Sequence, residues 1–257
     1  MAVITFMSDF GTDDHYVATV KGKILSKNPS QQIVDISHAI KPYDISHAAT
    51  VLKSVYHEFP SGTVHLVSVD SVKERSPGVA IRLEDHFFVG FNCGLFSMLS
   101  EKEPTEIVEI DIAESTFPAK DILSEAAIEL STGGTLKKLG NSLDGLVKLF
   151  ARQLKVTKRE ISGNVVNVDH YGNLITNITK TEFDKILEIN GSTVSYQIRF
   201  GRESFDQTNH FFSDVESGDC YVLFNSIGYL QIGLNKGNAS QLLGLAIDAP
   251  VHIEFTN

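Results

Sequence analysis

Polar residues follow three apolar segments in the first half of the chain, at positions where α/β proteins bind small molecules. Residues 8–12 (Ser-Asp-Phe-Gly-Thr) follow the first segment, Asp70 follows a Val-rich one, and Asn92 comes after a third. Ligands of open α/β sheets bind at the carboxyl ends of the strands. A carboxylate there is costly to desolvate without a partner or a chemical role. The pattern predicts a small-molecule site that includes Asp9 and Asp70.

The same residues also have structural interpretations. Asp9, Thr12 and Asp13 carry side chains that commonly cap helices and turns. Arg75 follows Asp70 by five residues, and an Arg near a carboxylate can hold it ionised and oriented. A solvated ion pair on a surface loop accounts for that spacing too. The residue types alone leave both interpretations open.

Two polar segments in the second half lie between strand candidates. Residues 169–173 read Asp-His-Tyr-Gly-Asn and residues 225–229 read Asn-Ser-Ile-Gly-Tyr. Both are typical of hairpin turns, and Gly228 is the residue that a positive φ would require. The nine histidines lack the spacing of metal ligands, and Gly11 begins neither a dinucleotide fingerprint nor a phosphate-binding loop. We therefore expect no metal site.

The first 130 residues alternate short apolar runs with helical patterns, which indicates an α/β domain with a largely parallel sheet. Asp44 is placed to cap a helix whose apolar stripe runs from Ile45 to Phe59. The strands are expected at residues 2–6, 33–36, 63–69, 79–83, 87–89 and 106–110, and further helices at 16–25, 94–99 and 121–130.

The pattern changes after about residue 160, where short strands are separated by Gly, Asn, Asp and Ser. This predicts a smaller all-β, barrel-like or sandwich domain with brief helices at 181–187 and 239–245. The strands are expected at residues 164–169, 174–178, 194–200, 220–224, 230–234 and 251–255. The domain boundary falls between residues 141 and 162, which gives domains 1–155 and 162–257.

Composition excludes several classes of function. The net charge of −10 and the isoelectric point near 5.3 argue against a nucleic-acid-binding surface. No apolar run is long enough to span a membrane. The N-terminus reads as a strand and not as a signal peptide. Cys93 and Cys220 are far apart, so neither a disulfide framework nor a zinc site is indicated. We expect a cytoplasmic protein.

Five segments, in the same order, resemble the S-adenosyl-L-methionine (SAM) hydroxide adenosyltransferases, relatives of the fluorinating and chlorinating enzymes. The resemblance runs from Ile4 to about Phe255, nearly the whole chain. The segments that carry it are residues 6–12, 41–44, 64–70, 169–177 and 225–230. It implies an α/β N-terminal domain, a β-barrel C-terminal domain and a homotrimer. Each site would lie between the N-terminal domain of one subunit and the C-terminal domain of its neighbour.

The resemblance also implies roles in the N-terminal domain. Asp9 matches a carboxylate that accepts hydrogen bonds from both ribose hydroxyls, where charge-assisted bonds fix the orientation of the sugar. Tyr43 matches an aromatic residue that lines the ribose and the sulfonium, a cation that is favourably placed near a π face. Asp70 and Arg75 match two members of an Asp-Arg-His set that positions and polarises the attacking water.

In the C-terminal domain, the resemblance implies contacts with the remainder of SAM. Asp169 and Ser226 match the positions that hold the ammonium and carboxylate of the methionine part. Tyr171 and Asn173 match adenine contacts. A further adenine-binding stretch is matched by Asn238 and Ala239. SAM would be the substrate, and no cofactor is implied.

The chain departs from the family around the water. Its loop between Asp70 and Arg75 is shorter, Phe91-Asn92-Cys93 replaces Pro-Asp-Asn, and Pro118 replaces the family His. The predicted function is hydrolysis of SAM to adenosine and L-methionine, because positioning can supply as much rate as a lost acid–base group. The alternative is a non-catalytic binder of SAM or adenosine. Halogenation is disfavoured because a halide about 4 Å from an ionised Asp70 would cost roughly 4 kcal/mol at an effective dielectric of 20.

Overall fold

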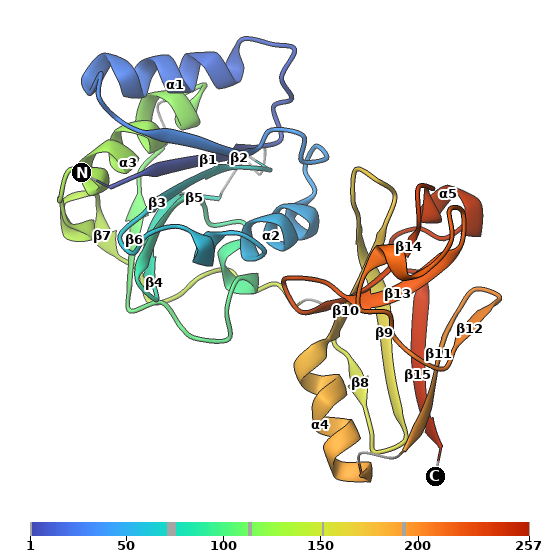
Figure 1. Cartoon of the computed structure of the whole chain (residues 1–257). Coiled ribbons are helices and arrows are strands. Elements are labelled where there is room, and N and C mark those ends of the chain that lie inside the picture. Colours follow the sequence, from blue (N-terminus) through green and yellow to red (C-terminus); the bar gives the residue numbers. More distant parts are fainter. Residues whose placement is uncertain (1, 71–75, 113–114, 151, 192–193, 257) are drawn as a thin grey trace. The chain divides into compact units, whose positions relative to one another are not determined.

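A computed structural model describes residues 2–70, 76–112, 115–150, 152–191 and 194–256. The chain divides into two compact units, Met1–Ala151 and Arg152–Asn257 (Figure 1). Each unit carries its own apolar core.

The N-terminal unit is built on one mixed sheet. In the described chain its strands are β1 (Ile4–Ser8), β2 (Ile33–Ser37), β3 (Val64–Ser68), β4 (Gly78–Leu83), β5 (His86–Phe91), β6 (Glu106–Ile110) and β7 (Asn141–Ser142), in the order β2-β1-β3-β5-β4-β6-β7. The strands β2, β1, β3 and β5 are parallel, whereas β4, β6 and β7 pair antiparallel. The expectation of a largely parallel sheet is therefore correct only for one half. The hairpin at Glu84 reverses the chain and places β4 antiparallel between β5 and β6.

In the described part of this unit, three α-helices accompany the sheet: α1 (Tyr16–Lys27), α2 (Ile45–Lys53) and α3 (Ser124–Ser131). Helices α1 and α3 lie on one side of the sheet and α2 on the other (Figure 1). Asp44 caps α2 as predicted, since its carboxylate accepts a hydrogen bond from the His47 N–H. The predicted helix to Phe59 is too long. It ends at Lys53, and the chain tightens into a 3₁₀ helix, Tyr56–Glu58, that buries the Tyr56 ring completely.

Two buried histidines lie in the core of this unit. The His65 ring nitrogen Nδ1 lies 2.7 Å from the Thr5 hydroxyl, and His65 Nε2 lies 3.2 Å from Nδ1 of His86. The two imidazoles pack against Tyr56 and Phe88. Burial lowers the pKa of His65 to about 3 and also lowers the pKa of His86. Repulsion between protonated rings, from His86 and His57, adds to the effect on the pKa of His65. Both rings are therefore neutral in the folded protein at neutral pH.

This pair predicts a loss of stability in mild acid. The unfolded state takes up a proton at His65 near pH 6.5, whereas the folded state takes it up only near pH 3. The free energy of unfolding should thus fall as the pH drops below about 6.5, by up to ~1.4 kcal/mol per pH unit for each such histidine. Urea titrations at pH 7, 6 and 5 measure the slope. His65→Leu should give a shallower slope, and an unchanged slope would contradict this assignment.

The C-terminal unit is an antiparallel, barrel-like sheet. Its described strands are β8 (Lys155–Val156), β9 (Glu160–Val168), β10 (Leu174–Thr179), β11 (Ser195–Phe200), β12 (Glu203–Phe205), β13 (Cys220–Phe224), β14 (Tyr229–Leu234) and β15 (Pro250–Thr256). Seven follow the order β12-β11-β15-β9-β10-β14-β13, and β8 pairs with β9. The predicted short helices are present as α4 (Lys180–Asn190) and α5 (Ala239–Leu243). The prediction of a barrel-like β domain is confirmed.

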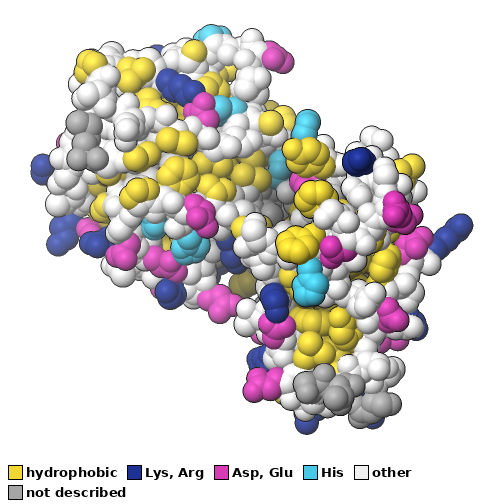
Figure 2. Space-filling model, viewed as in Figure 1, with side chains coloured by type: hydrophobic (Ala, Val, Ile, Leu, Met, Phe, Trp, Pro, Cys, Tyr) yellow, Lys and Arg dark blue, Asp and Glu magenta, His cyan; other side chains and the backbone are white. Residues whose placement is uncertain are grey.

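Charge and apolar residues are mixed on the surface. On the face shown in Figure 2, basic and acidic side chains are interspersed, and hydrophobic side chains lie uncovered between them. Among the described residues, no helix has the length and apolar character needed to cross a bilayer.

Candidate functional site

Asp9 links three segments at one edge of the N-terminal sheet. It follows β1, and its Oδ2 accepts hydrogen bonds from the backbone N–H groups of Tyr43 (3.0 Å) and Asp70 (3.3 Å). Asp70 follows β3, and Tyr43 lies in the segment between β2 and α2. One carboxylate oxygen therefore joins three residues that the sequence assigns to the site, although they are up to 61 positions apart. The structure brings Asp9, Tyr43 and Asp70 together.

Both residues bound by Asp9 have unusual backbones. Tyr43 has φ +65° and Asp70 has φ +53°, in the left-handed region that favours glycine. Such a conformation costs about 1–3 kcal/mol and persists where the surroundings enforce it, often at functional sites. The Asp9 carboxylate supplies part of that enforcement. The Tyr43 side chain is exposed and the Asp70 side chain is buried.

Helix capping does not account for Asp9. Helix α1 begins at Tyr16 with His15 at its N-cap position, and no side chain caps it. The Asp9 carboxylate instead binds the backbone of two distant loops. Arg75, the proposed partner of Asp70, lies outside the described residues.

Asn92 has a structural contact at the same edge of the sheet. Its side chain is buried, and its Oδ1 accepts a hydrogen bond from the Val147 N–H at 2.8 Å. This bond anchors the segment that leads out of the N-terminal unit. Sequence reasoning placed Asn92 with the ligand-binding residues, whereas the structure shows it holding the backbone.

The segment that contains Pro118 lies beside the Asp9 loop. Phe10, Tyr16 and Phe117 form an aromatic cluster whose ring centroids are 5.6–5.7 Å apart. Pro118 then begins a π-helical turn, Ala119–Leu123, with φ −56°, which proline readily adopts. Pro118 stands where the resemblance expects a histidine. It follows Phe117, whose ring packs on Phe10.

In the C-terminal unit, Asp169 organises the turn between β9 and β10. Its Oδ1 accepts hydrogen bonds from the N–H groups of Tyr171 and Asn173, both at 2.9 Å, and its Oδ2 accepts one from the Asn173 side-chain amide. Gly172 within the turn has φ +83°. The predicted turn at residues 169–173 is confirmed, and it leaves Tyr171 exposed and Asn173 buried.

A hydrogen-bond chain connects this turn to the second one. The Tyr221 hydroxyl donates to Asn173 Oδ1 (3.1 Å) and accepts from the Gln231 amide (3.3 Å). Gln231 Oε1 in turn accepts from Asn225 (3.4 Å). Sequence reasoning missed Tyr221 and Gln231, because only pairing between β13 and β14 brings the two side chains to the same polar network.

The remaining candidates lie on these turns or on α5. The turn at 225–229 is held by Asn225 Oδ1, which accepts from two backbone N–H groups, and Gly228 has the predicted positive φ. Ser226 is exposed on that turn. Asn238 caps α5 through the Gln241 N–H, and Ala239 is fully buried. A side chain at Gly172 would collide with the Asn238 amide, so the first turn and α5 are in close contact.

The C-terminal unit also carries large apolar side chains that are exposed. Tyr171, Phe211, Phe212 and Leu242 are each more than 60% exposed. Sequence reasoning did not single out Phe211 and Phe212. Their signal is a pair of adjacent aromatics within the polar stretch 206–214.

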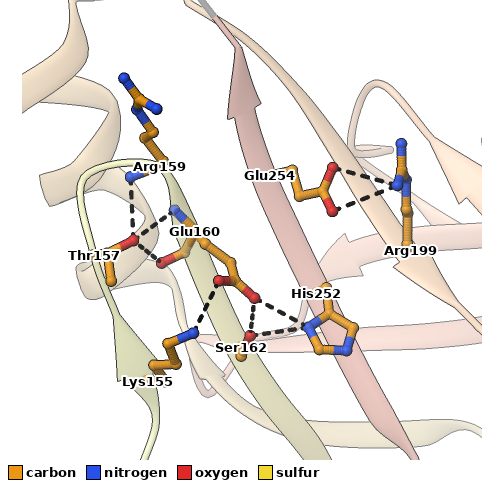
Figure 3. Close-up of polar contacts among 8 residues, drawn as sticks. All are labelled: Lys155, Thr157, Arg159, Glu160, Ser162, Arg199, His252 and Glu254. Atoms are coloured by element: carbon orange, nitrogen blue, oxygen red, sulfur yellow. Dashed lines mark hydrogen bonds and ion pairs between the residues drawn. The ribbon is translucent and has the colours of Figure 1, made fainter.

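A second polar cluster lies on the strands β8, β9, β11 and β15 (Figure 3). It contains Ser162, His252 and Glu160, the residue types of a hydrolytic triad. The Ser162 Oγ and the Glu160 Oε1 both lie against the same nitrogen, His252 Nδ1, at 2.9 and 3.4 Å. A triad needs the two partners on opposite ring nitrogens. This geometry is that of a surface hydrogen-bond cluster, in which Lys155 pairs with Glu160.

Metal ligation explains neither the Asp9 junction nor the polar groups of the C-terminal unit. Within the described ranges, no group of three or more His, Cys, Asp or Glu side chains is arranged to hold a metal ion.

Comparisons with known proteins cover both units. Residues 4–140 match the sequence profile of the SAM hydroxide adenosyltransferase N-terminal domain, and residues 163–252 match that of the C-terminal domain. The chain is 32% identical to the (R)-S-adenosyl-L-methionine hydrolase of Methanocaldococcus jannaschii, over 95% of this chain and 92% of that protein. It is 28% identical to a fluorinase of Actinoplanes sp., over 91% of both chains. A crystal structure of an uncharacterized conserved protein from Thermotoga maritima is similar with a TM-score of 0.87 and 32% identity, covering 98% and 99% of the two chains.

Proposed function

Because the chain belongs to the SAM hydroxide adenosyltransferase family, we propose that it is a SAM hydrolase that forms adenosine and L-methionine. The observation that carries this proposal is the junction of Asp9, Tyr43 and Asp70. There the Asp9 carboxylate accepts hydrogen bonds from the backbone N–H groups of the other two residues. Relatives named (R)-S-adenosyl-L-methionine hydrolase match nearly the whole chain at 26–32% identity.

In this proposal, Asp9 and Tyr43 of the N-terminal unit bind the adenosyl part of the substrate. The two backbone bonds to Asp9 fall on Oδ2, and we assign Oδ1 to the ribose hydroxyls. A vicinal diol suits an ionised acceptor, because charge-assisted hydrogen bonds are short and directional. The exposed Tyr43 ring would lie against the sulfonium, which a π face attracts.

The reaction is a displacement at the 5′ carbon. The water oxygen forms a bond to this carbon, the carbon–sulfur bond breaks, and its electron pair becomes a lone pair on the sulfur of methionine. The sulfonium is already a good leaving group, so no acid is required at sulfur. Asp70 would orient the water and take its proton, and Arg75 would keep Asp70 ionised. The reaction uses SAM and water and requires no cofactor.

The C-terminal cluster, which consists of the turns at 169–173 and 225–229 and the start of α5, would bind the methionine part and the adenine of the substrate. Asp169 and Ser226 would bind the methionine part, and the Tyr171 turn, Asn173, and the start of α5 at Asn238 and Ala239 would bind adenine. We propose a homotrimer in which this cluster completes the site of a neighbouring subunit. The trimer and the cytoplasmic location stay predictions.

A turnover assay tests the function. Purified protein and SAM in H₂¹⁸O should yield adenosine that carries the label at its 5′ oxygen, together with an equal amount of methionine, as read by mass spectrometry. Chloride should not stimulate turnover or give a 5′-halogenated nucleoside. Non-enzymatic breakdown is controlled with the heat-denatured protein.

The replacement of the family His by Pro118 favours a second candidate, a non-catalytic binder, because proline has no proton to exchange. Calorimetric binding of SAM or adenosine, without labelled adenosine above the denatured control, would support the binder and reject the hydrolase.

A further inference from the structure

Two loops of the N-terminal unit are joined at His38. The Ser8 hydroxyl lies 2.7 Å from Nδ1 of His38, and the His38 carbonyl accepts the Gly11 N–H at 2.9 Å. The bond from the Tyr43 N–H to Asp9 connects the same two loops a third time. These contacts flank Asp9 on both sides, so the position of its carboxylate depends on the attachment at His38.

The contacts at this junction favour one arrangement of protons, although His38 Nε2 makes an ion-pair contact with Asp35 and not an aligned hydrogen bond. His38 Nε2 lies 3.3 Å from Oδ1 of Asp35, and a nearby carboxylate favours a proton on that nitrogen. Nδ1 then carries a lone pair and accepts the hydroxyl proton of Ser8. The Ser8 oxygen in turn is the acceptor of the Phe10 N–H at 3.4 Å. The neutral imidazole therefore fixes the residues immediately before and after Asp9.

The Ser-His-Asp composition of this junction does not indicate a nucleophile. The Ser8 side chain has no exposed surface and His38 is only 6% exposed. The His38 ring also packs edge-on against Phe6 with centroids 4.7 Å apart. A hydroxyl sealed in this way cannot attack a substrate, so its hydrogen bond acts on the structure around it.

We infer that His38, in its neutral form, is a positioning residue that holds the Asp9 carboxylate in place for the ribose of the adenosyl ligand. This inference rests on the proposed function for the identity of the ligand. The attachment of the Asp9 loop to the His38 loop does not depend on the proposed function.

Protonation of His38 would reverse the Ser8 bond. The charged ring donates from both nitrogens, so Ser8 could no longer donate to Nδ1. The groups that face the ring are Asp35 on β2, Lys21 on α1, which pairs with Asp35, Ser8 on β1 and the Phe6 ring. Burial lowers the pKa of His38 against the opposing effect of Asp35, so the neutral form prevails at neutral pH. Ligand affinity should fall as the pH drops below the ordinary histidine range.

The protein contains a matched control on the same strand. Thr5 and His65 repeat the hydroxyl-to-Nδ1 contact at 2.7 Å, also with a fully buried hydroxyl residue on β1. His65→Leu should therefore disturb the core as much as His38→Leu does, without touching the loops at Asp9. His38→Asn serves as the conservative variant, because its Oδ1 can occupy the place of Nδ1 and accept the Ser8 proton.

The experiment measures ligand affinity and amide hydrogen exchange on the full chain. We expect His38→Leu and Ser8→Ala each to raise the KM for SAM at least tenfold, with the double variant no worse than either single one. His38→Asn should recover most of the loss and show less acid dependence of KM. His65→Leu should leave KM unchanged.

Hydrogen exchange separates this inference from the proposed function, because it needs no ligand. The amides of Gly11 and Tyr43 should exchange at least tenfold faster in His38→Leu than in the wild type, and at the wild-type rate in His65→Leu. Unchanged exchange, or equal acceleration in both variants, would overturn the inference even if SAM is hydrolysed. Faster exchange only in His38→Leu supports it even if no turnover is found.

Discussion

Asp70→Asn is expected to lower the rate of adenosine formation by about 10²–10⁴-fold, the usual effect of losing a general base. Asparagine is among the few residues that tolerate a left-handed backbone, so the φ of +53° and the N–H bond to Asp9 should survive. The amide keeps the size of the side chain but cannot take a proton from water. The affinity for SAM should therefore change only a few-fold, and kcat should carry the loss.

Glu84→Gln is the matched control. Glu84 is also a carboxylate on a left-handed residue, with φ +53°, but it lies at the β4–β5 turn and pairs with Lys102. Single-turnover measurements on both variants separate chemistry from binding. A rate for Asp70→Asn within threefold of the wild type would remove Asp70 from the proposed mechanism.

Asp9 variants should lose ligand affinity, in two steps. Asp9→Asn keeps a carbonyl oxygen for the Tyr43 and Asp70 N–H groups but removes the charge, which should weaken adenosine binding by about 1.5–3 kcal/mol, or roughly 10–100-fold. Asp9→Ala also leaves both N–H groups without this acceptor. It should weaken binding further and lower kcat, because Asp70 is no longer held.

Asp44→Ala provides the comparison for these variants. Asp44 follows Tyr43 and also accepts a backbone N–H, that of His47, at 2.9 Å. Its loss should cost about 1 kcal/mol of stability as a missing helix cap and leave adenosine affinity unchanged. Calorimetry on the three variants tests this order. Equal affinities for Asp9→Asn and the wild type would rule out a charged contact with the ribose.

The sequence predicted most elements because their local signals agree with their packing. The segment at residues 63–69 is rich in Val, a residue typical of buried strands, and every residue of β3 is buried. Asp44 begins a helix with the expected cap. Orientation was less predictable, because the expected strands at 79–83 and 106–110 carry no local signal that β4 pairs antiparallel with β6.

The candidate site was predictable as a set of residues and not as an arrangement. Asp9 and Asp70 could be chosen because each is a polar residue at the end of an apolar strand. The left-handed backbone of Tyr43 and Asp70 could not be predicted, because neither residue is a glycine. The Asp9 carboxylate, which helps to hold this conformation, is far away in the sequence. Tyr221 was equally hidden, because strand pairing creates its place between Asn173 and Gln231.

The chain of hydrogen bonds from Asn173 through Tyr221 and Gln231 to Asn225 has a consequence for how the two products would leave. A ligand that shifts one turn would shift the other through this chain, so the two turns would respond to ligands together. In the proposed site, adenine lies against the first turn, and methionine lies against Asp169 of that turn and Ser226 of the second. Each product would then make the other bind more tightly by the same factor. The two products would dissociate as a linked pair, the first departure releasing the second.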